Sequence, residues 1–214
     1  MGDGGWLRWA RELQAIAQSR LRYAEDPDCA GDAFDAERYR DVGRVAAAMM
    51  AEATVGDIDT IAAVFDEQVG HATPKLDIRG VVFDDRDRVL LVRERLDDDR
   101  WTLPGGWVDV NEAPSVAVCR EVREETGFEV RARRLLAVWD RDRHAHPPSP
   151  FHTWEVLVDC DIVGGSATST LETFDPRFWP VDDLPPPSLS RVTAAQLERL
   201  LALHHDPGRQ AAFD

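Results

Sequence analysis

The hydrophobic pattern of the chain changes near residue 70, and this change limits the fold more than any other feature of the sequence. In the first part, apolar residues recur every three or four positions, which is the spacing of amphipathic helices. Gly70–Pro74 interrupts this pattern, and short apolar runs separated by turn residues follow, as expected for strands. We therefore predict a small helical domain over residues 1–70 and a second domain over residues 71–214. The expected helices of the first domain cover residues 6–23, 35–52 and 58–69.

The second domain is expected to be of the α/β class. Its apolar runs predict strands, and two segments with helical periodicity lie between and after them. Pro114 suits the first turn of a helix and Gly127 suits its end, so the first of these helices should run from Pro114 to Thr126. This mixture indicates helices packed on a mixed sheet. The expected strands cover residues 78–83, 89–92, 135–139, 154–159 and 177–179, and the last helix covers residues 193–204.

Net charge, hydrophobicity and cysteine content argue against several functional classes of protein. The formal net charge of −15 argues against nucleic-acid binding, which needs a basic surface, but permits a phosphorylated small molecule if divalent cations lie between the partners. No apolar run is long enough to cross a bilayer, and the N-terminus has no secretory pattern, so we expect a cytoplasmic protein without a membrane partner. Cys29, Cys119 and Cys160 fit neither a disulfide framework nor a Cys-x-x-Cys metal site, and we expect them to be reduced.

Three glutamates on the expected helix 114–126 carry the main chemical signal. Glu121, Glu124 and Glu125 stand at positions i, i+3 and i+4, which lie on one face of a helix. Carboxylates this close repel one another unless cations neutralise them, and Arg120 alone cannot neutralise three. A dense set of hard oxygen ligands favours Mg²⁺ or Mn²⁺, which in turn binds phosphate oxygens and activates water. The alternative is an ordinary solvated helix face, because strings of Arg and Glu are common on exposed helices.

The residues before the helix favour the metal site. From Gly106 to Phe128 the chain follows the pattern Gly-x5-Glu-x7-Arg-Glu-apolar-x-Glu-Glu-x-Gly-apolar, with Glu112 as its first glutamate. This pattern resembles the Nudix box at every defined position. The single mild departure is Phe128, where an aliphatic residue is more usual.

The resemblance implies a Nudix α/β/α sandwich with a mixed sheet and a metal-dependent hydrolase. It implies that the main-chain carbonyl of Gly106 and the carboxylates of Glu121, Glu124 and Glu125 surround Mg²⁺ or Mn²⁺. It assigns Glu112 a supporting role through water or a salt bridge, and assigns Arg120 the role of orienting the glutamates. The catalytic set implied within the box is therefore Glu112, Arg120, Glu121, Glu124 and Glu125.

Segments outside the box resemble a Nudix subgroup with its own helical N-terminal domain, described as CDP-choline or ADP-ribose pyrophosphatases. We therefore expect hydrolysis of the pyrophosphate bond of a nucleoside diphosphate linked to another moiety, NDP-X, with CDP-choline as the first substrate and ADP-ribose as the second. Two alternatives remain: an enzyme that processes nucleoside triphosphates or RNA ends, and a regulator that binds a nucleotide without cleaving it. The first domain resembles that of a dimeric subgroup and is too small to form much core alone, so we expect it to form a homodimer.

The loop 140–152 and one later glutamate are the remaining candidates for the site. If this loop borders the pocket, its aromatic and polar residues can contact the base or a phosphate; the alternative is a solvent loop. Glu172 lies where many Nudix enzymes place a further carboxylate, as metal ligand or general base, and Asp140 is its rival; either can equally be a surface acid. The candidate substrate-binding residues are Trp139, Asp140, His144, His146 and Phe151.

Overall fold

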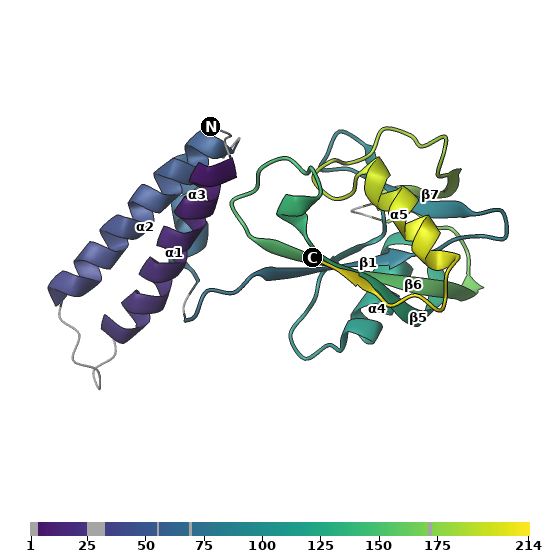
Figure 1. Ribbon diagram of the computed structural model, residues 1–214, viewed down its shortest axis with the longest axis horizontal. Coiled ribbons are helices and arrows are strands. Elements are labelled where there is room, and N and C mark those ends of the chain that lie inside the picture. The colour runs from purple at the N-terminus through teal and green to yellow at the C-terminus, as the bar shows by residue number, and fades with distance from the viewer. Residues whose placement is uncertain (1–3, 25–32, 55, 69, 171–172) are drawn as a thin grey trace. The chain divides into compact units, whose positions relative to one another are not determined.

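The computed structural model describes residues 4–24, 33–54, 56–68, 70–170 and 173–214. The chain divides into two compact units (Figure 1). The first contains Met1–Pro74 and Pro148–His152, and the second contains Lys75–Pro147 and Thr153–Asp214. The first unit thus extends to Pro74 rather than residue 70, and it includes a segment, 148–152, that we expected in the second domain.

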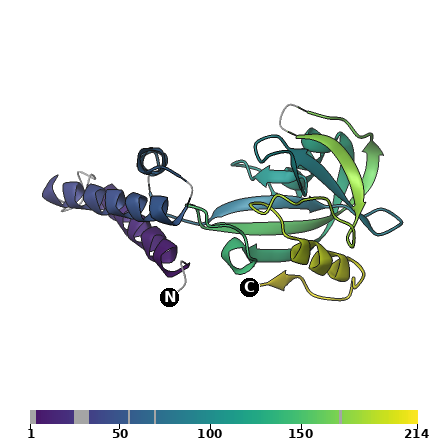
Figure 2. The same cartoon turned by 90° about the horizontal axis from the view of Figure 1, so that it is seen from above.

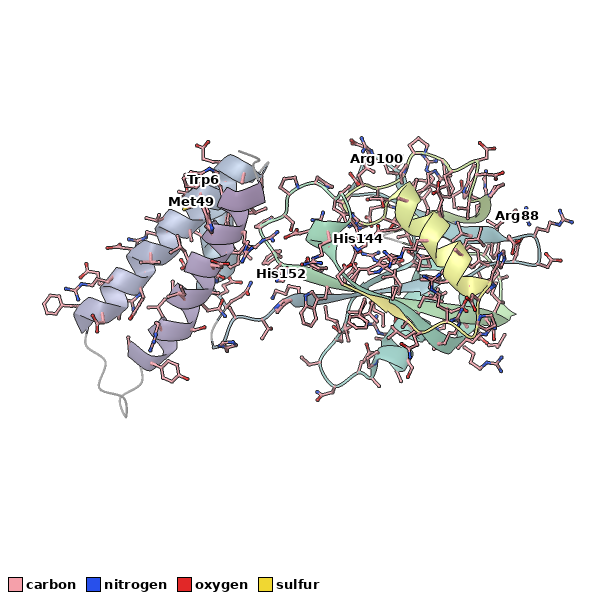
Figure 3. All side chains as sticks on the ribbon, in the orientation of Figure 1. Trp6, Met49, Arg88, Arg100, His144 and His152 are labelled. Carbon is pink, nitrogen blue, oxygen red and sulfur yellow. The ribbon has the colours of Figure 1, made fainter. Side chains whose placement is uncertain are left out.

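The first unit is helical, as predicted. It contains α1 (Gly4–Ala24), α2 (Ala33–Ala53) and α3 (Ile58–Asp66). Asp57 caps α3, because its side chain accepts hydrogen bonds from the main-chain N–H groups of Asp59 and Thr60. The two long helices lie side by side, and Trp6 on α1 and Met49 on α2 lie toward the same end of the pair (Figures 1 and 3). The buried residues between the helices include Leu7, Ala10, Ala47, Met50 and Ile61.

Several large apolar side chains of the first unit remain exposed. Trp6, Trp9 and Ile16 on α1 are each more than half exposed, and the Trp6 and Trp9 rings meet edge to face at 5.4 Å. Met50, by contrast, is fully buried within the unit. Phe65 packs against Phe151, with ring centroids 5.5 Å apart. Exposed apolar surface that could contact a partner therefore lies on α1, and also on α2 at Phe34 and Val45.

The second unit contains two sheets. The larger sheet has the strand order β4-β1-β6-β5-β8, in which β1 pairs with β6 in parallel and with β4 in antiparallel orientation. The smaller sheet has the order β3-β2-β7. The strands are β1 (Lys75–Val81), β2 (Arg88–Glu94), β3 (Arg100–Thr102), β4 (Gly105–Trp107), β5 (Phe128–Asp140), β6 (Thr153–Gly165), β7 (Thr173–Pro180) and β8 (Ala212–Phe213). All five expected strands are present, and the three that the sequence did not indicate, β3, β4 and β8, have only two or three residues each.

Helices α4 (Pro114–Thr126) and α5 (Ala194–His204) belong to two different cores of this unit. Ile78 and Val82 of the β1 segment pack with residues of α4, whereas Val81 packs with residues of α5. Because side chains alternate along a strand, Asp77 and Arg79 point to the same face of β1 as Val81. The result is the expected α/β/α sandwich, and α5 lies along one face of the larger sheet (Figure 2).

The structure also bears on the cysteines and on the possibility of a membrane-spanning helix. Cys119 and Cys160 are free thiols, and Cys29 lies outside the described residues. Within the described parts of the chain, no helix combines the length and the apolar character that a membrane span requires.

Candidate active site

Helix α4 presents the three glutamates, and its ends are those the sequence predicts. Pro114 occupies its first turn, and Gly127 ends it in the left-handed conformation at φ 77°, donating its N–H to the carbonyl of Arg123 at 2.9 Å. Val118 and Val122, on an adjoining face of the helix, are completely buried against the larger sheet. This packing leaves the glutamate face toward β4 and the segment before it.

Glu125 is the most buried of the three carboxylates and is held by the main chain. Gly105 donates its N–H to Glu125 Oε2 at 2.8 Å, and the hydroxyl of Thr173 donates to the Glu125 main-chain carbonyl at 2.9 Å. Burial raises the pKa of Glu125 to about 7, although the Arg79 cation and the Gly105 N–H both oppose this rise. A buried carboxyl with this pKa is one that a bound divalent cation would keep ionised.

Glu121 faces the main chain of Gly106. A Cβ atom on Gly106 would lie only 3.3 Å from Glu121 Oε2, so the absence of a side chain lets the carboxylate approach this segment. Gly105 is required even more strictly, because its φ is +140° and an added Cβ would lie 2.0 Å from the carbonyl oxygen of Ile78. Burial raises the pKa of Glu121, and the Arg120 cation opposes this rise.

Arg120 contacts three carboxylates around this helix face. It donates to both oxygens of Glu112 at 2.9 Å and to Glu124 at 3.0 Å, and it lies 2.9 Å from Glu121. A two-point pair of this kind fixes the guanidinium plane. Its carboxylate partners raise the pKa of Arg120, and Arg120 in turn lowers the pKa of Glu112. These contacts allow Arg120 to orient the glutamates, and that role remains a prediction.

The donor set suits a divalent cation. The available groups are three carboxylates and a main-chain carbonyl, all hard oxygen ligands of the kind that Mg²⁺ and Mn²⁺ prefer. In the parts of the chain that the structure describes, no three His, Cys, Asp or Glu side chains converge on one point. The reason is visible in the contacts: Arg120 holds Glu121 and Glu124, and Gly105 holds Glu125. Binding of one ion by all three carboxylates would therefore require side-chain rotation on α4.

Comparison with protein families shows which family has this arrangement of residues. The NUDIX domain matches residues 73–200, which is more than half of the chain. The chain belongs to the Nudix hydrolase family. A UDP-X-like, N-terminal oligomerisation domain matches residues 5–65, which covers the helical unit of this Nudix hydrolase.

Individual relatives agree with this assignment. YjhB of Bacillus subtilis (strain 168), to which ADP-ribose pyrophosphatase activity is provisionally ascribed, is 37% identical over 98% of this chain and 97% of its own. The structure of an ADP-ribose pyrophosphatase from Streptococcus suis 89-1591 is 37% identical and covers 66% of this chain and 100% of its own, with a TM-score of 0.61. The structure of a UDP-X diphosphatase is 29% identical and covers 100% of both chains, with a TM-score of 0.62.

Sequence reasoning missed two buried charged residues of this Nudix hydrolase. Arg79 on β1 donates to Asp77 at 2.9 Å and to the carbonyl of Gly105 at 2.6 Å, and so contacts the segment that holds Glu125. Glu94 ends β2, is buried, and pairs with Arg191 at 3.2 Å. The available signal was charge at the start of an otherwise apolar strand: Arg79 follows Ile78 in the predicted strand 78–83, and Asp77 directly precedes it.

The structure corrects two of the predicted substrate contacts. Trp139 is fully buried and stacks on His144 with ring centroids 4.7 Å apart, so its ring has no face for a nucleobase. The imidazole of His146 is also completely buried, 2.7 Å from the carbonyl of Leu189 and 3.3 Å from Glu155. Trp139 points from β5 into the core that contains residues of α5, and His146 points from the loop to Glu155, which also contacts Gln196 of α5. Neither is free to contact substrate in this arrangement.

The other loop candidates are engaged elsewhere. His144 contacts Asp214 through Nε2 at 2.9 Å, and Asp140 accepts the N–H of Asp142 at 3.1 Å to begin the short 3-10 helix Arg141–Arg143. Phe151 belongs to the helical unit, together with Phe65. Substrate contacts by Asp140, His144 and Phe151 remain predictions. Glu172 lies outside the described residues, and its role as a further ligand or base also remains a prediction.

Proposed function

We propose that this Nudix hydrolase cleaves the pyrophosphate bond of a nucleoside diphosphate derivative, NDP-X, and depends on Mg²⁺ or Mn²⁺. The observation that carries the proposal is the intact set of Glu121, Glu124 and Glu125 opposite the Gly105–Gly106 main chain. A divalent ion bound there supplies charge neutralisation for the pyrophosphate and activation of water. The protein supplies the placement: Arg120 orients the glutamates, and the buried Glu125 holds its carboxylate on a main-chain N–H group.

The relatives favour ADP-ribose over CDP-choline as the first substrate to test. Two of those reported above are described as ADP-ribose pyrophosphatases and one as a UDP-X diphosphatase. The sequence alone suggested the opposite order. We therefore propose ADP-ribose first, with UDP-linked compounds and CDP-choline next.

A substrate panel tests this proposal. The full chain is incubated with ADP-ribose, CDP-choline, a UDP-sugar, nucleoside triphosphates and 5′-triphosphorylated RNA, each with Mg²⁺ or Mn²⁺, and the products are identified by mass. Formation of a nucleoside monophosphate and a phosphorylated X supports the proposal. Cleavage confined to triphosphates or RNA ends would favour the processing alternative. Binding without turnover of any compound would favour the regulator.

Trp107 is the aromatic side chain best placed to stack on a base. It directly follows Gly106, is 55% exposed, and lies beside Asp77 on the edge strand β4. Stacking of a base on an aromatic ring is worth about 1–3 kcal/mol. We expect Trp107→Ala to raise KM for the preferred NDP-X roughly tenfold, with kcat little changed, because stacking binds ground state and transition state alike.

Trp154→Ala is the matched control for this variant. Trp154 is also an exposed tryptophan of the larger sheet, but it pairs with Leu76, whose side chain points to the opposite face from Asp77. Steady-state kinetics should show wild-type KM for Trp154→Ala. Equal KM values for the two variants would remove the stacking role from Trp107.

We also propose that the helical unit forms a homodimer through α1. The match to an oligomerisation domain and the exposed Trp9 and Ile16, which lie on one helix face two turns apart, support this. The double variant Trp9→Glu, Ile16→Glu should shift the protein from dimer to monomer at micromolar concentration, measured by analytical ultracentrifugation. Val163→Glu, at an exposed position on β6, is the control and should remain dimeric. A monomeric wild type would contradict the dimer, and a dimer unaffected by the α1 substitutions would place its interface elsewhere.

A further inference from the structure

Arg79 holds the segment that precedes β4 and the catalytic helix. Its side chain is buried, and Nη1 donates to two main-chain carbonyls, those of Leu103 at 3.2 Å and Gly105 at 2.6 Å. The carbonyl between them, of Pro104, accepts the main-chain N–H of Gly80 at 2.8 Å. Three successive carbonyls thus accept hydrogen bonds from β1, and a single side chain supplies the bonds to the first and the third.

This segment is the one that faces the metal-binding glutamates. Gly105 accepts from Arg79 through its carbonyl and donates through its N–H to Glu125 at 2.8 Å. The next residue, Gly106, faces Glu121. Two adjacent glycines give the backbone more conformational freedom than any other pair, and β4 has only three residues with which to restrain it. Gly106 pairs with Ile78 of β1, and the bonds from Arg79 to the carbonyls of Leu103 and Gly105 add a second restraint on the segment that leads into it.

An arginine is suited to this task because its donors are fixed relative to one another. Nε donates to Asp77 Oδ2 at 2.9 Å, which orients the planar guanidinium so that Nη1 meets the two carbonyls. Lysine has a single ammonium on a flexible stem and cannot make the same set of bonds in one geometry. Asp77 and Arg79 are both buried, and such a pair adds little net stability, so stability alone does not account for it.

We propose that Arg79 is a positioning residue that holds the segment 103–106 in the conformation in which the Gly106 carbonyl faces a divalent ion. The inference rests on the metal dependence proposed above. A positioning role and a purely electrostatic role of Arg79 predict opposite changes in metal affinity when Arg79 is replaced. A buried cation near a cation site repels the ion, so removing its charge alone should leave metal binding unchanged or tighten it. Removing a positioning residue should weaken it.

The test measures how tightly the full chain binds Mn²⁺ in the absence of substrate. Free Mn²⁺ is quantified by electron paramagnetic resonance. The double variant Asp77→Asn, Arg79→Met removes both buried charges together, which avoids an unpaired carboxylate. We expect its Mn²⁺ dissociation constant to rise about tenfold or more, in the range for loss of an outer-shell partner. Asp77→Asn alone is the matched control, because its amide oxygen still accepts from Nε; its constant should stay within about threefold of wild type, below that outer-shell range. A folded double variant that binds Mn²⁺ as tightly as wild type, or more tightly, would overturn the proposal.

Arg79→Lys provides the second measurement and covers the case in which the double variant does not fold. Lysine keeps the charge but not the fork of donors, so positioning predicts Mn²⁺ binding weaker than wild type, whereas a role of the charge alone predicts wild-type binding. Thermal unfolding of each variant separates positioning from stability, since a merely structural role lowers the melting temperature and leaves the Mn²⁺ dissociation constant unchanged.

Wild-type protein that binds Mn²⁺ but cleaves no NDP-X would refute the proposed function and leave this inference standing. Wild-type protein that binds no Mn²⁺ would overturn both.

Discussion

Glu125→Gln and Glu124→Gln are each expected to lower kcat toward the preferred NDP-X by more than about 100-fold, beyond the 10–100-fold cost of losing an outer-shell partner. Both side chains are proposed as direct metal ligands, and an amide is a poor substitute for a carboxylate with a hard cation. The fold should survive, because the amide oxygen at residue 125 can still accept the Gly105 N–H and the volume is unchanged. Steady-state kinetics with Mg²⁺, together with circular dichroism of each variant, measures the effect.

Glu198→Gln is the control for these variants. Glu198 is an exposed glutamate on α5, so its substitution should leave kcat at the wild-type value. Turnover near the wild-type rate in both α4 variants would refute the assignment of the ligands. Full activity of the wild type in excess EDTA would refute the metal requirement itself.

The metal-free protein should become less stable as the pH rises from 5 to 8, and Glu125 should account for much of the change. Burial raises the pKa of this carboxyl from 4.5 to about 7 in the folded state. The contribution of Glu125 to stability is therefore complete below pH 4.5 and is lost as the pH rises through 7, where the buried group must ionise. The corresponding free energy is about 3 kcal/mol.

Comparison with Glu125→Gln isolates this contribution. In EDTA the variant cannot ionise at residue 125, so at pH 8 it should melt roughly 5–10 °C above wild type, and at pH 5 the two should nearly coincide. Added Mg²⁺ should raise the melting temperature of the wild type at pH 8 and leave the variant nearly unchanged, because ligand binding stabilises only a protein that binds it. The same difference between variant and wild type at both pH values would show that Glu125 titrates normally.

The bounds of α4 and the grouping of its glutamates could be predicted from the sequence because their determinants lie close together along the chain. Pro114 and Gly127 define the ends of α4, and the spacing of Glu121, Glu124 and Glu125 places them on one face whatever surrounds the helix. The cap of α3 by Asp57 is local in the same sense. The change of periodicity near residue 70 likewise separates helices from strands before any contact between them is known.

Side-chain direction and distant partners were decided only by the tertiary structure. Trp139 looked available to a base because the sequence does not say which face of β5 is covered; packing against the α5 core buries it completely. The short strands β3 and β4 gain their hydrogen bonds from neighbouring strands rather than from any local preference. Phe151 joins a unit whose helices lie more than eighty residues earlier in the chain.

The residues that hold the glutamates in place also depend on the tertiary structure rather than on local sequence. Arg79, Gly105 and Glu125 form one chain of hydrogen bonds, but twenty or more residues separate each from the next in the sequence. No local rule links them, and only the pairing of β1 with β4 and the packing of α4 on β1 bring them together. The sequence therefore determines which residues carry the charge of the site, because helical spacing is local. The tertiary structure determines what holds them in place, because a buried charge is stable only beside partners that the fold supplies.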